Sequence, residues 1–306
     1  MRSRAVFAAF LVLALAVGVV VGMSTPRDAA VTGAAASPGQ EAQDALAQVA
    51  QRDAWLRDVA TASVAGRLDG RSVAVLVAAG VSAEDVDQVV AALGEAGATV
   101  GVEAALSAQW WAPEFAAYRS EIADQLEGSV AGVDGLASTE VLQHAIVQAL
   151  VPGAVPPGAD TAGDVGVDFP SDAVAADRAD VLREVLTRSE LLSVHTRATG
   201  RVDALLLVTA DGPEGGGTVA DLAAGVWEQY VSATVVVVFS EIESPPVATE
   251  AIAHGTTLAI KNRPSVVIAT HAALTPPQVV FALVEQAAGG TGSYGTAENL
   301  PLIASP

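Results

Sequence analysis

The feature that most constrains this chain is an uncharged apolar run from Ala5 to Met23. As a helix with a rise of ~1.5 Å per residue the run is about 28 Å long, which is enough to cross the hydrocarbon core of a bilayer. Arg2 and Arg4 precede the run, and positive charges favour the cytoplasmic side of a membrane. The sequence therefore predicts that the residues after the run are exported.

Two interpretations of this segment remain open. A cleaved secretory signal has a shorter apolar region with a small-residue cleavage site close behind it. Here Ser24 to Asp28 contain no such site, and the run of small residues Ala34 to Ala36 lies well beyond the apolar end. We therefore expect residues 1–23 to be a retained N-terminal transmembrane anchor, with a cleaved signal as the alternative.

Composition excludes several classes of protein. The net charge of −20 argues against nucleic-acid binding, because phosphate contacts need clustered lysine and arginine. Without cysteine the chain has no disulfides, thiolate metal sites or cysteine catalysis. Methionine occurs only as Met1 and Met23, which leaves no thioether site for copper. Since hydrolase and nucleotide-binding motifs are also missing, we expect neither an enzyme nor a cofactor.

A tether and a helix are predicted to follow the anchor. Residues 24–40 are small and polar, which is typical of a flexible tether, and residues 41–66 have a helical pattern. Asp53 interrupts an apolar stripe on this membrane-proximal helix. The members of the stripe have heptad-like spacing and are Ala42, Leu46, Val49, Leu56 and Ala60. The helix can therefore form a coiled coil with a protein partner or a second copy of the chain, or pack on its own domain.

From residue 70 onwards, strand and helix patterns alternate. The run Ser72–Val77 is continuously apolar, as expected for a strand that is covered on both faces. Ser82 and Asp85 then form the pattern of a helix N-terminus, and apolar residues follow at helical spacing. The next strand pattern is Thr99–Ala104. This order of strand, helix and strand predicts a parallel pair.

The same alternation continues to the end of the chain. Further strands are predicted at Leu205–Val208, Val235–Phe239 and Ser265–Ala269, and further helices around Trp111–Tyr118, Val141–Ala149, Val174–Leu186, Thr218–Tyr230 and Gln278–Ala287. We expect an α/β fold, with a mainly parallel, three-layer domain over residues 70–306 and an irregular, Gly-rich tail from Gly289. Trp110 and Trp111 are expected to pack in the core at the edge of the sheet, with an exposed docking patch as the alternative.

The histidines are the candidate metal ligands. His271 closes the last predicted strand, where α/β folds place their sites, and His254 lies shortly before it. No metal-ligand spacing supports this pair. We expect His144 on the exposed face of its helix, and His195 just after a helix end, where an imidazolium suits the helix dipole.

Three stretches resemble the actinobacterial copper transport protein B family. They are the end of the anchor (Val17–Gly22), the start of the α/β domain (Gly70–Val75) and the closing Gly289–Gly295. The last is the most specific, because that family also ends in a Gly-rich, Tyr-Gly tail. The tail residues that carry the resemblance are Gly292, Tyr294 and Gly295. The chain departs from the family at Ala272–Pro277, where acidic residues and a Gly-Arg step would be expected.

The resemblance implies a role in copper efflux or homeostasis in the cell envelope, described for the family as a pore in the outer membrane. A second class of function stays open. The chain can be a single-pass envelope scaffold whose stalk helix and α/β head bind other proteins in cell-wall growth or division. The heptad stripe and the scarcity of copper ligands favour this alternative.

Overall fold

A computed structural model describes residues 38–78, 80–151, 172–196, 202–210, 233–239, 264–269 and 274–295. The chain divides into two compact units, residues 1–50 and 51–306. Of the first unit only residues 38–50 are described, and they form the start of helix α2 (Pro38–Val64). Within the described ranges no helix has both the length and the apolarity that a bilayer span needs. The predicted anchor and most of the tether lie outside these ranges.

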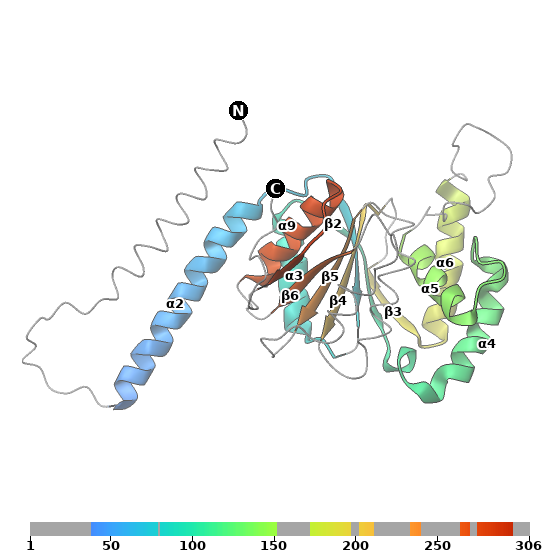
Figure 1. The fold of residues 1–306 in the computed structure, drawn as a ribbon, viewed down its shortest axis with the longest axis horizontal. Coiled ribbons are helices and arrows are strands. Elements are labelled where there is room, and N and C mark those ends of the chain that lie inside the picture. Colours follow the sequence, from blue (N-terminus) through green and yellow to red (C-terminus); the bar gives the residue numbers. More distant parts are fainter. Residues whose placement is uncertain are drawn as a thin grey trace, which may run out of the picture. The chain divides into compact units, whose positions relative to one another are not determined.

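The second unit is built around a seven-stranded sheet (Figure 1). The strands are β1 (Ser72–Val77), β2 (Thr99–Leu106), β3 (Leu192–Thr196), β4 (Ala204–Ala210), β5 (Ala233–Phe239), β6 (Ser265–Ala269) and β7 (Ser293–Gly295). They lie in the order β3-β2-β1-β4-β5-β6-β7, and every neighbouring pair is parallel except β2 with β3. The predicted mainly parallel α/β domain is confirmed.

The central strands are apolar along their length because helices cover both faces of the sheet. In β1, Val73 and Val75 belong to one core cluster, whereas Ala74 and Leu76 belong to the other. All four are fully buried. The β-branched residues that fill β5 and β6 suit such a doubly covered sheet.

Two groups of helices make up the outer layers. On one face, α3 (Ala83–Glu95) and α9 (Thr275–Ala287) share a core cluster with the strands. On the other, the cluster includes α4 (Ala116–Leu126), α5 (Ser138–Leu150) and α6 (Asp172–Arg188), which are grouped near the β3 end of the sheet (Figure 1). The three-layer arrangement is therefore confirmed.

The predicted start of α3 is confirmed by its local contacts. The Ser82 hydroxyl accepts a hydrogen bond from the Asp85 N–H at 3.1 Å and so caps the helix. Gly97 follows the helix with a φ of +85°. A Cβ at this position would lie 1.9 Å from Asp69 Oδ1, so the turn into β2 requires glycine.

Two predictions about secondary structure are wrong, and one strand was missed. The tail contains β7, whose Tyr294 pairs with Val267 of β6, so it is not irregular throughout. Strand β3 was not predicted, although its first four residues, Leu192 to His195, alternate apolar and polar as in a half-buried strand. The segment predicted as a helix around Trp111–Tyr118 contains two 3-10 helices (Ala108–Trp110 and Pro113–Phe115) before α4 begins.

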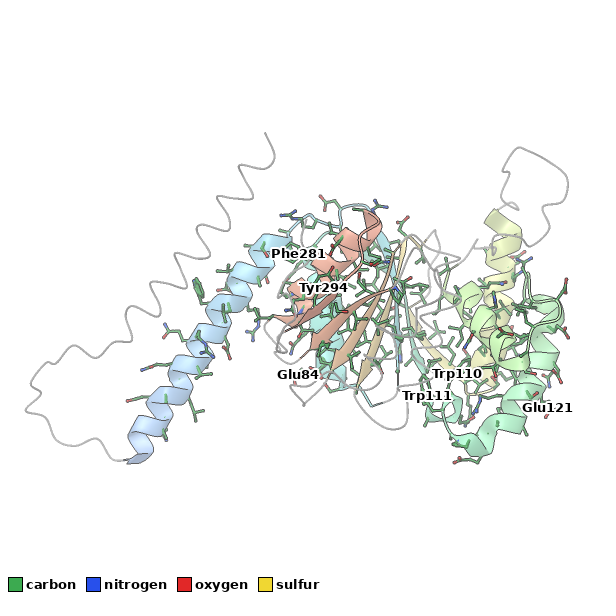
Figure 2. The ribbon with its side chains drawn as sticks, in the orientation of Figure 1. Glu84, Trp110, Trp111, Glu121, Phe281 and Tyr294 are labelled. Carbon is green, nitrogen blue, oxygen red and sulfur yellow. The ribbon has the colours of Figure 1, made fainter. Side chains whose placement is uncertain are left out.

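The aromatic residues of this segment nevertheless pack as expected. Trp110 is buried in the core cluster on the α4–α6 side of the sheet, close to Trp111 (Figure 2). Trp111 and Tyr118 pack against that cluster. The Tyr118 hydroxyl donates a hydrogen bond to the Ser189 carbonyl at 3.1 Å. The prediction of core packing is therefore confirmed, and the alternative of an exposed docking patch is wrong.

Candidate functional site

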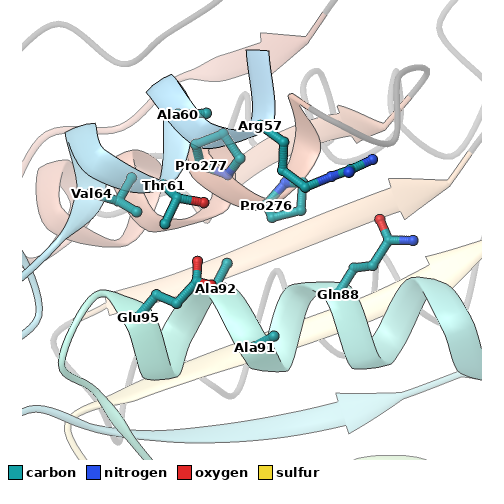
Figure 3. Close-up of a pocket in the computed structure, with 10 residues that line it drawn as sticks. All are labelled: Arg57, Ala60, Thr61, Val64, Gln88, Ala91, Ala92, Glu95, Pro276 and Pro277. Atoms are coloured by element: carbon teal, nitrogen blue, oxygen red, sulfur yellow. The ribbon is translucent and has the colours of Figure 1, made fainter. Parts of the chain in front are cut away.

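A groove of about 120 Å³ lies between the C-terminal part of α2, α3 and the start of α9 (Figure 3). Small apolar side chains make most of its wall, and polar side chains stand at its rim. The residues that line it are Arg57, Ala60, Thr61, Val64, Gln88, Ala91, Ala92, Glu95, Pro276 and Pro277. Cofactor and drug-sized ligands occupy pockets of roughly 300–1,000 Å³. The groove is therefore of a size for one apolar side chain.

Short side chains create this groove where three helices meet. Ala60 of α2 and Ala91 and Ala92 of α3 end at Cβ, so the space that longer side chains would fill stays open (Figure 3). Pro276 and Pro277 lie in the first turn of α9. Proline is tolerated there because the N–H groups of a first turn have no acceptor within the helix.

The C-terminal end of α2 is attached to the α/β domain just beyond the groove. Val64 and Leu68 are buried in the core cluster that also contains α3 and α9. The Leu68 N–H donates to the Ala96 carbonyl at 2.8 Å. The Arg67 guanidinium lies 5.8 Å from the ring centroid of Phe281, a cation–π contact. These contacts hold the groove-lining part of α2 in place.

The rim of the groove carries both signs of charge, from Arg57 and Glu95. At the start of α3 the first turn holds Glu84 and Asp85, which would repel an anion from the N-terminus of the helix. The arrangement therefore suits a protein surface of mixed charge better than a phosphate.

The three tail residues singled out from the sequence lie on the edge of the sheet. Gly292 immediately precedes β7, its N–H donates to Ser265 Oγ at 3.3 Å, and its carbonyl accepts from the Val266 N–H at 2.9 Å. Tyr294 is 3% exposed, and its hydroxyl donates to the Glu285 carboxylate of α9. Gly295 ends β7 and is also buried.

Three further side chains, which were not identified from the sequence, belong to this cluster: Ser265, Glu285 and Gln286. Ser265 Oγ donates to Gln286 Oε1 at 2.6 Å, below the tail. We call Ser265, Glu285, Gln286, Gly292 and Tyr294 the tail clasp. Burial raises the pKa of Tyr294, and the hydrogen bond to Glu285 and the charge of that carboxylate raise it further. The clasp joins the last strand to the last helix, so we infer a structural role for it.

The stripe residues of the stalk helix differ in exposure. Leu46 is 70% exposed and Val49 is 44% exposed, whereas Leu56 is half-buried. Trp55, which the stripe did not include, is 37% exposed. Residues 38–64 form one helix, close to the predicted 41–66. Leu46 and Val49 are three residues apart and share one side of the helix, where they form an apolar surface that a partner can cover, whereas Trp55 lies on the side opposite Leu46.

The prediction for His144 is wrong, because this residue is 6% exposed. Residues Val141–Leu150 of α5 are buried on every side, since the helix packs against both α4 and α6. Burial lowers the pKa of His144, and the Glu140 charge partly opposes this shift. His195 is exposed on β3.

The metal candidates His254 and His271 lie outside the described residues. Within the parts of the chain that the structure describes, no group of three or more His, Asp and Glu side chains is arranged to hold a metal ion. The pair therefore stays a prediction.

Comparison with known proteins connects this fold to a family. No curated protein matches the chain. The family model for MctB, described as a copper transport outer membrane protein, matches residues 1–302. This match takes in the predicted anchor, the stalk helix, the α/β domain and the tail clasp. The chain belongs to the MctB family of copper transport outer membrane proteins.

Proposed function

We propose that the chain acts in copper efflux or homeostasis as a single-pass protein of the cell envelope. Membership of the MctB family implies the role in copper transport or homeostasis, and the match over residues 1–302 is the observation that carries the proposal. The uncharged run Ala5–Met23 supports the anchor, with the rest of the chain exported. In this proposal the α/β domain binds and positions other molecules and performs no catalysis.

Direct contact with copper would involve His254 and His271 in this proposal. Neutral imidazole is a good copper ligand, and the chain offers neither cysteine nor an internal methionine besides Met23. Residue 269 ends β6, so His271 follows the carboxyl end of a parallel strand, where α/β folds place their ligands.

The test is the copper content per cell of a deletion strain in copper-supplemented medium. We expect more copper in the deletion strain than in its parent, and restoration by the wild-type gene. A His254→Ala, His271→Ala double variant should fail to restore the parental level, whereas His195→Ala, at an exposed histidine of β3, should restore it. Equal copper in parent and deletion strain would overturn the proposal, and full rescue by the double variant would remove the histidines from it.

A second function is favoured by the exposed apolar residues of α2. Leu46 and Val49 project from one side of the stalk helix at a spacing of three residues, which suits a helix that pairs with another helix. The groove beside α3 adds a place for one apolar side chain of a partner. We propose, as the alternative, an envelope scaffold that recruits proteins in cell-wall growth or division through its stalk and its α/β head.

Polar substitution of the stripe separates the two functions. A Leu46→Gln, Val49→Gln, Leu56→Gln variant should lose its partner or its self-association, measured by cross-linking of the full-length protein in membranes. The matched control replaces Gln43, Gln48 and Gln51 by Ala, which preserves the helix and leaves the stripe intact. Cell morphology and septation that are the same in both variants and in the wild type would contradict the scaffold.

A further inference from the structure

The groove between α2, α3 and α9 runs back from the carboxyl edge of the sheet. Arg57 and Pro276 stand at one end of it, and Val64 and Glu95 at the other (Figure 3). Pro276 lies in the first turn of α9, which follows β6 in the chain, so this end is nearer to the edge where the parallel strands finish. The volume of about 120 Å³ suits one apolar side chain, and no side chain of the described residues fills it.

The chain leaves the sheet at this same edge. β7 is parallel to β6, and its last residue, Gly295, pairs with Ile268, one residue before β6 ends at Ala269. Since parallel strands finish at the same edge of a sheet, the chain continues from β7 at the edge where α9 begins. Residues 296–306, which lie outside the described ranges, therefore start at the edge that the near end of the groove faces.

The distance from β7 to the groove decides which of these residues can enter it. The path crosses one strand spacing of roughly 4.8 Å, one layer of roughly 10 Å and the width of α9, again roughly 10 Å. Placed end to end, these steps total about 25 Å, which seven or eight extended residues cover at ~3.3 Å each. Leu302 and Ile303 are the seventh and eighth residues after Gly295, whereas Leu300 falls short.

Residues 296–306 carry one short apolar stretch, Leu300 to Ile303. The other residues are small, polar or proline, so the side chains of this stretch are the ones that gain most from leaving water. Pro301 fixes its own φ and restricts Leu300 to extended backbone, which reduces the entropy that the stretch loses on binding. Adjacent side chains of an extended chain point to opposite sides, so a groove for one side chain takes either Leu302 or Ile303, and Leu302 is the first within reach.

The charges of the groove and of the segment are complementary. Glu298 is the single charged residue of 296–306, and Arg57 is the single cation among the residues that line the groove. None of the carboxylates in the described ranges forms an ion pair with Arg57. Glu298 precedes Leu302, and Arg57 stands at the end of the groove nearer to the carboxyl edge, so the two opposite charges meet as the leucine enters (Figure 3).

We propose that residues 298–302 of this chain cross the first turn of α9 and that the Leu302 side chain fills the groove. The segment then fastens the C-terminal part of α2 to the α/β domain, because one wall of the groove belongs to α2. The contact is independent of copper. In the scaffold alternative, a partner that uses the groove first displaces Leu302, so the segment controls access to this place.

A chain without cysteine allows this contact to be tested by cross-linking. Thr61→Cys and Ala304→Cys are introduced together into the full-length protein in detergent, and a short bismaleimide joins thiols that come close. Thr61 lines the groove, and residue 304 lies two residues beyond Leu302. The control pair is Gln125→Cys with Ala304→Cys, because Gln125 is exposed on α4, on the opposite face of the sheet. We expect cross-linking within one chain to be at least about tenfold faster for the groove pair.

Two variants of the groove pair test the role of the leucine. Leu302→Ser should slow cross-linking about tenfold, because burial of a leucine side chain is worth at least this factor. Ala91→Leu fills the groove from an exposed position of α3 and should have the same effect. The matched control is Gly94→Leu, at an exposed position of α3 outside the groove, where no atom lies within 4 Å of a Cβ. This control should leave the rate unchanged.

Equal rates for the groove pair and the control pair would overturn the proposal, as would a groove pair that neither Leu302→Ser nor Ala91→Leu slows. A product that joins two chains would assign the groove to the segment of a second copy and would also overturn it. The copper content of the deletion strain does not enter this test, so the proposed function is tested separately.

Discussion

Gly292→Ala should be strongly destabilising, because the tail clasp leaves no room for a methyl group. A Cβ on residue 292 would lie 2.2 Å from the Tyr294 hydroxyl oxygen and 2.6 Å from Cζ of the same ring. Real Cβ atoms do not approach other atoms so closely, and Tyr294 is buried, so the ring must move. Movement of the ring breaks the hydrogen bond from Tyr294 to the Glu285 carboxylate.

The magnitude follows from these two effects. Overpacking of a well-packed site typically costs about 1–3 kcal/mol. Loss of a hydrogen bond to a charged group costs about 1.5–3 kcal/mol. Together they predict that the free energy of unfolding falls by about 2.5–6 kcal/mol, a large part of the roughly 5–15 kcal/mol that holds a domain folded.

The assay is urea denaturation of the full-length protein in detergent, followed by circular dichroism. Gly94→Ala is the matched control, because no atom lies within 4 Å of a Cβ at this exposed position of α3. It should stabilise the protein by about 0.5–1 kcal/mol, since alanine is the better helix former.

A double-mutant cycle sharpens the prediction. Tyr294→Phe should cost less in the Gly292→Ala background than in the wild type, because the bond to Glu285 is already broken there. A loss below about 1 kcal/mol for Gly292→Ala, or fully additive effects of the two substitutions, would refute the clasp as described.

Three further predictions concern stability. Gln148→Ala should cost about 2–4 kcal/mol in the same assay, because the amide bonds both the N–H and the carbonyl of Ala131, at 3.0 and 2.8 Å. Folding raises the pKa of Tyr294, so the stability that this residue contributes is complete below its unfolded pKa of 10.0 and is lost as the pH rises above that value. Tyr294→Phe removes the titrating group and should therefore flatten the alkaline limb of a profile of unfolding free energy against pH. Folding lowers the pKa of His144, so stability should decline as pH falls below the unfolded value of 6.5, and an unchanged acid limb in His144→Gln would contradict this.

Elements with a strong local pattern were predicted well from the sequence. The apolar runs of β1, β5 and β6 predict buried parallel strands, and the Ser82 cap predicts the start of α3. These patterns are local. A strand that is covered on both faces needs apolar residues at every position, and a helix N-terminus needs one side chain that accepts a hydrogen bond from the first turn. The tail residues Gly292 and Tyr294 were identified through the family resemblance, but their partner Glu285 was not.

By itself the sequence determined the mainly parallel α/β class, the alternation of strands and helices, the absence of cysteine chemistry and the family. Only the tertiary structure decided what depends on neighbours distant in sequence. β3 and β7 are strands because β2 and β6 offer them a free edge. His144 is buried because α4 and α6 enclose its helix, although its polar side chain indicates an exposed face. Strand pairing and burial of this kind arise from the packing of whole elements, so they cannot be predicted from a short stretch of residues alone.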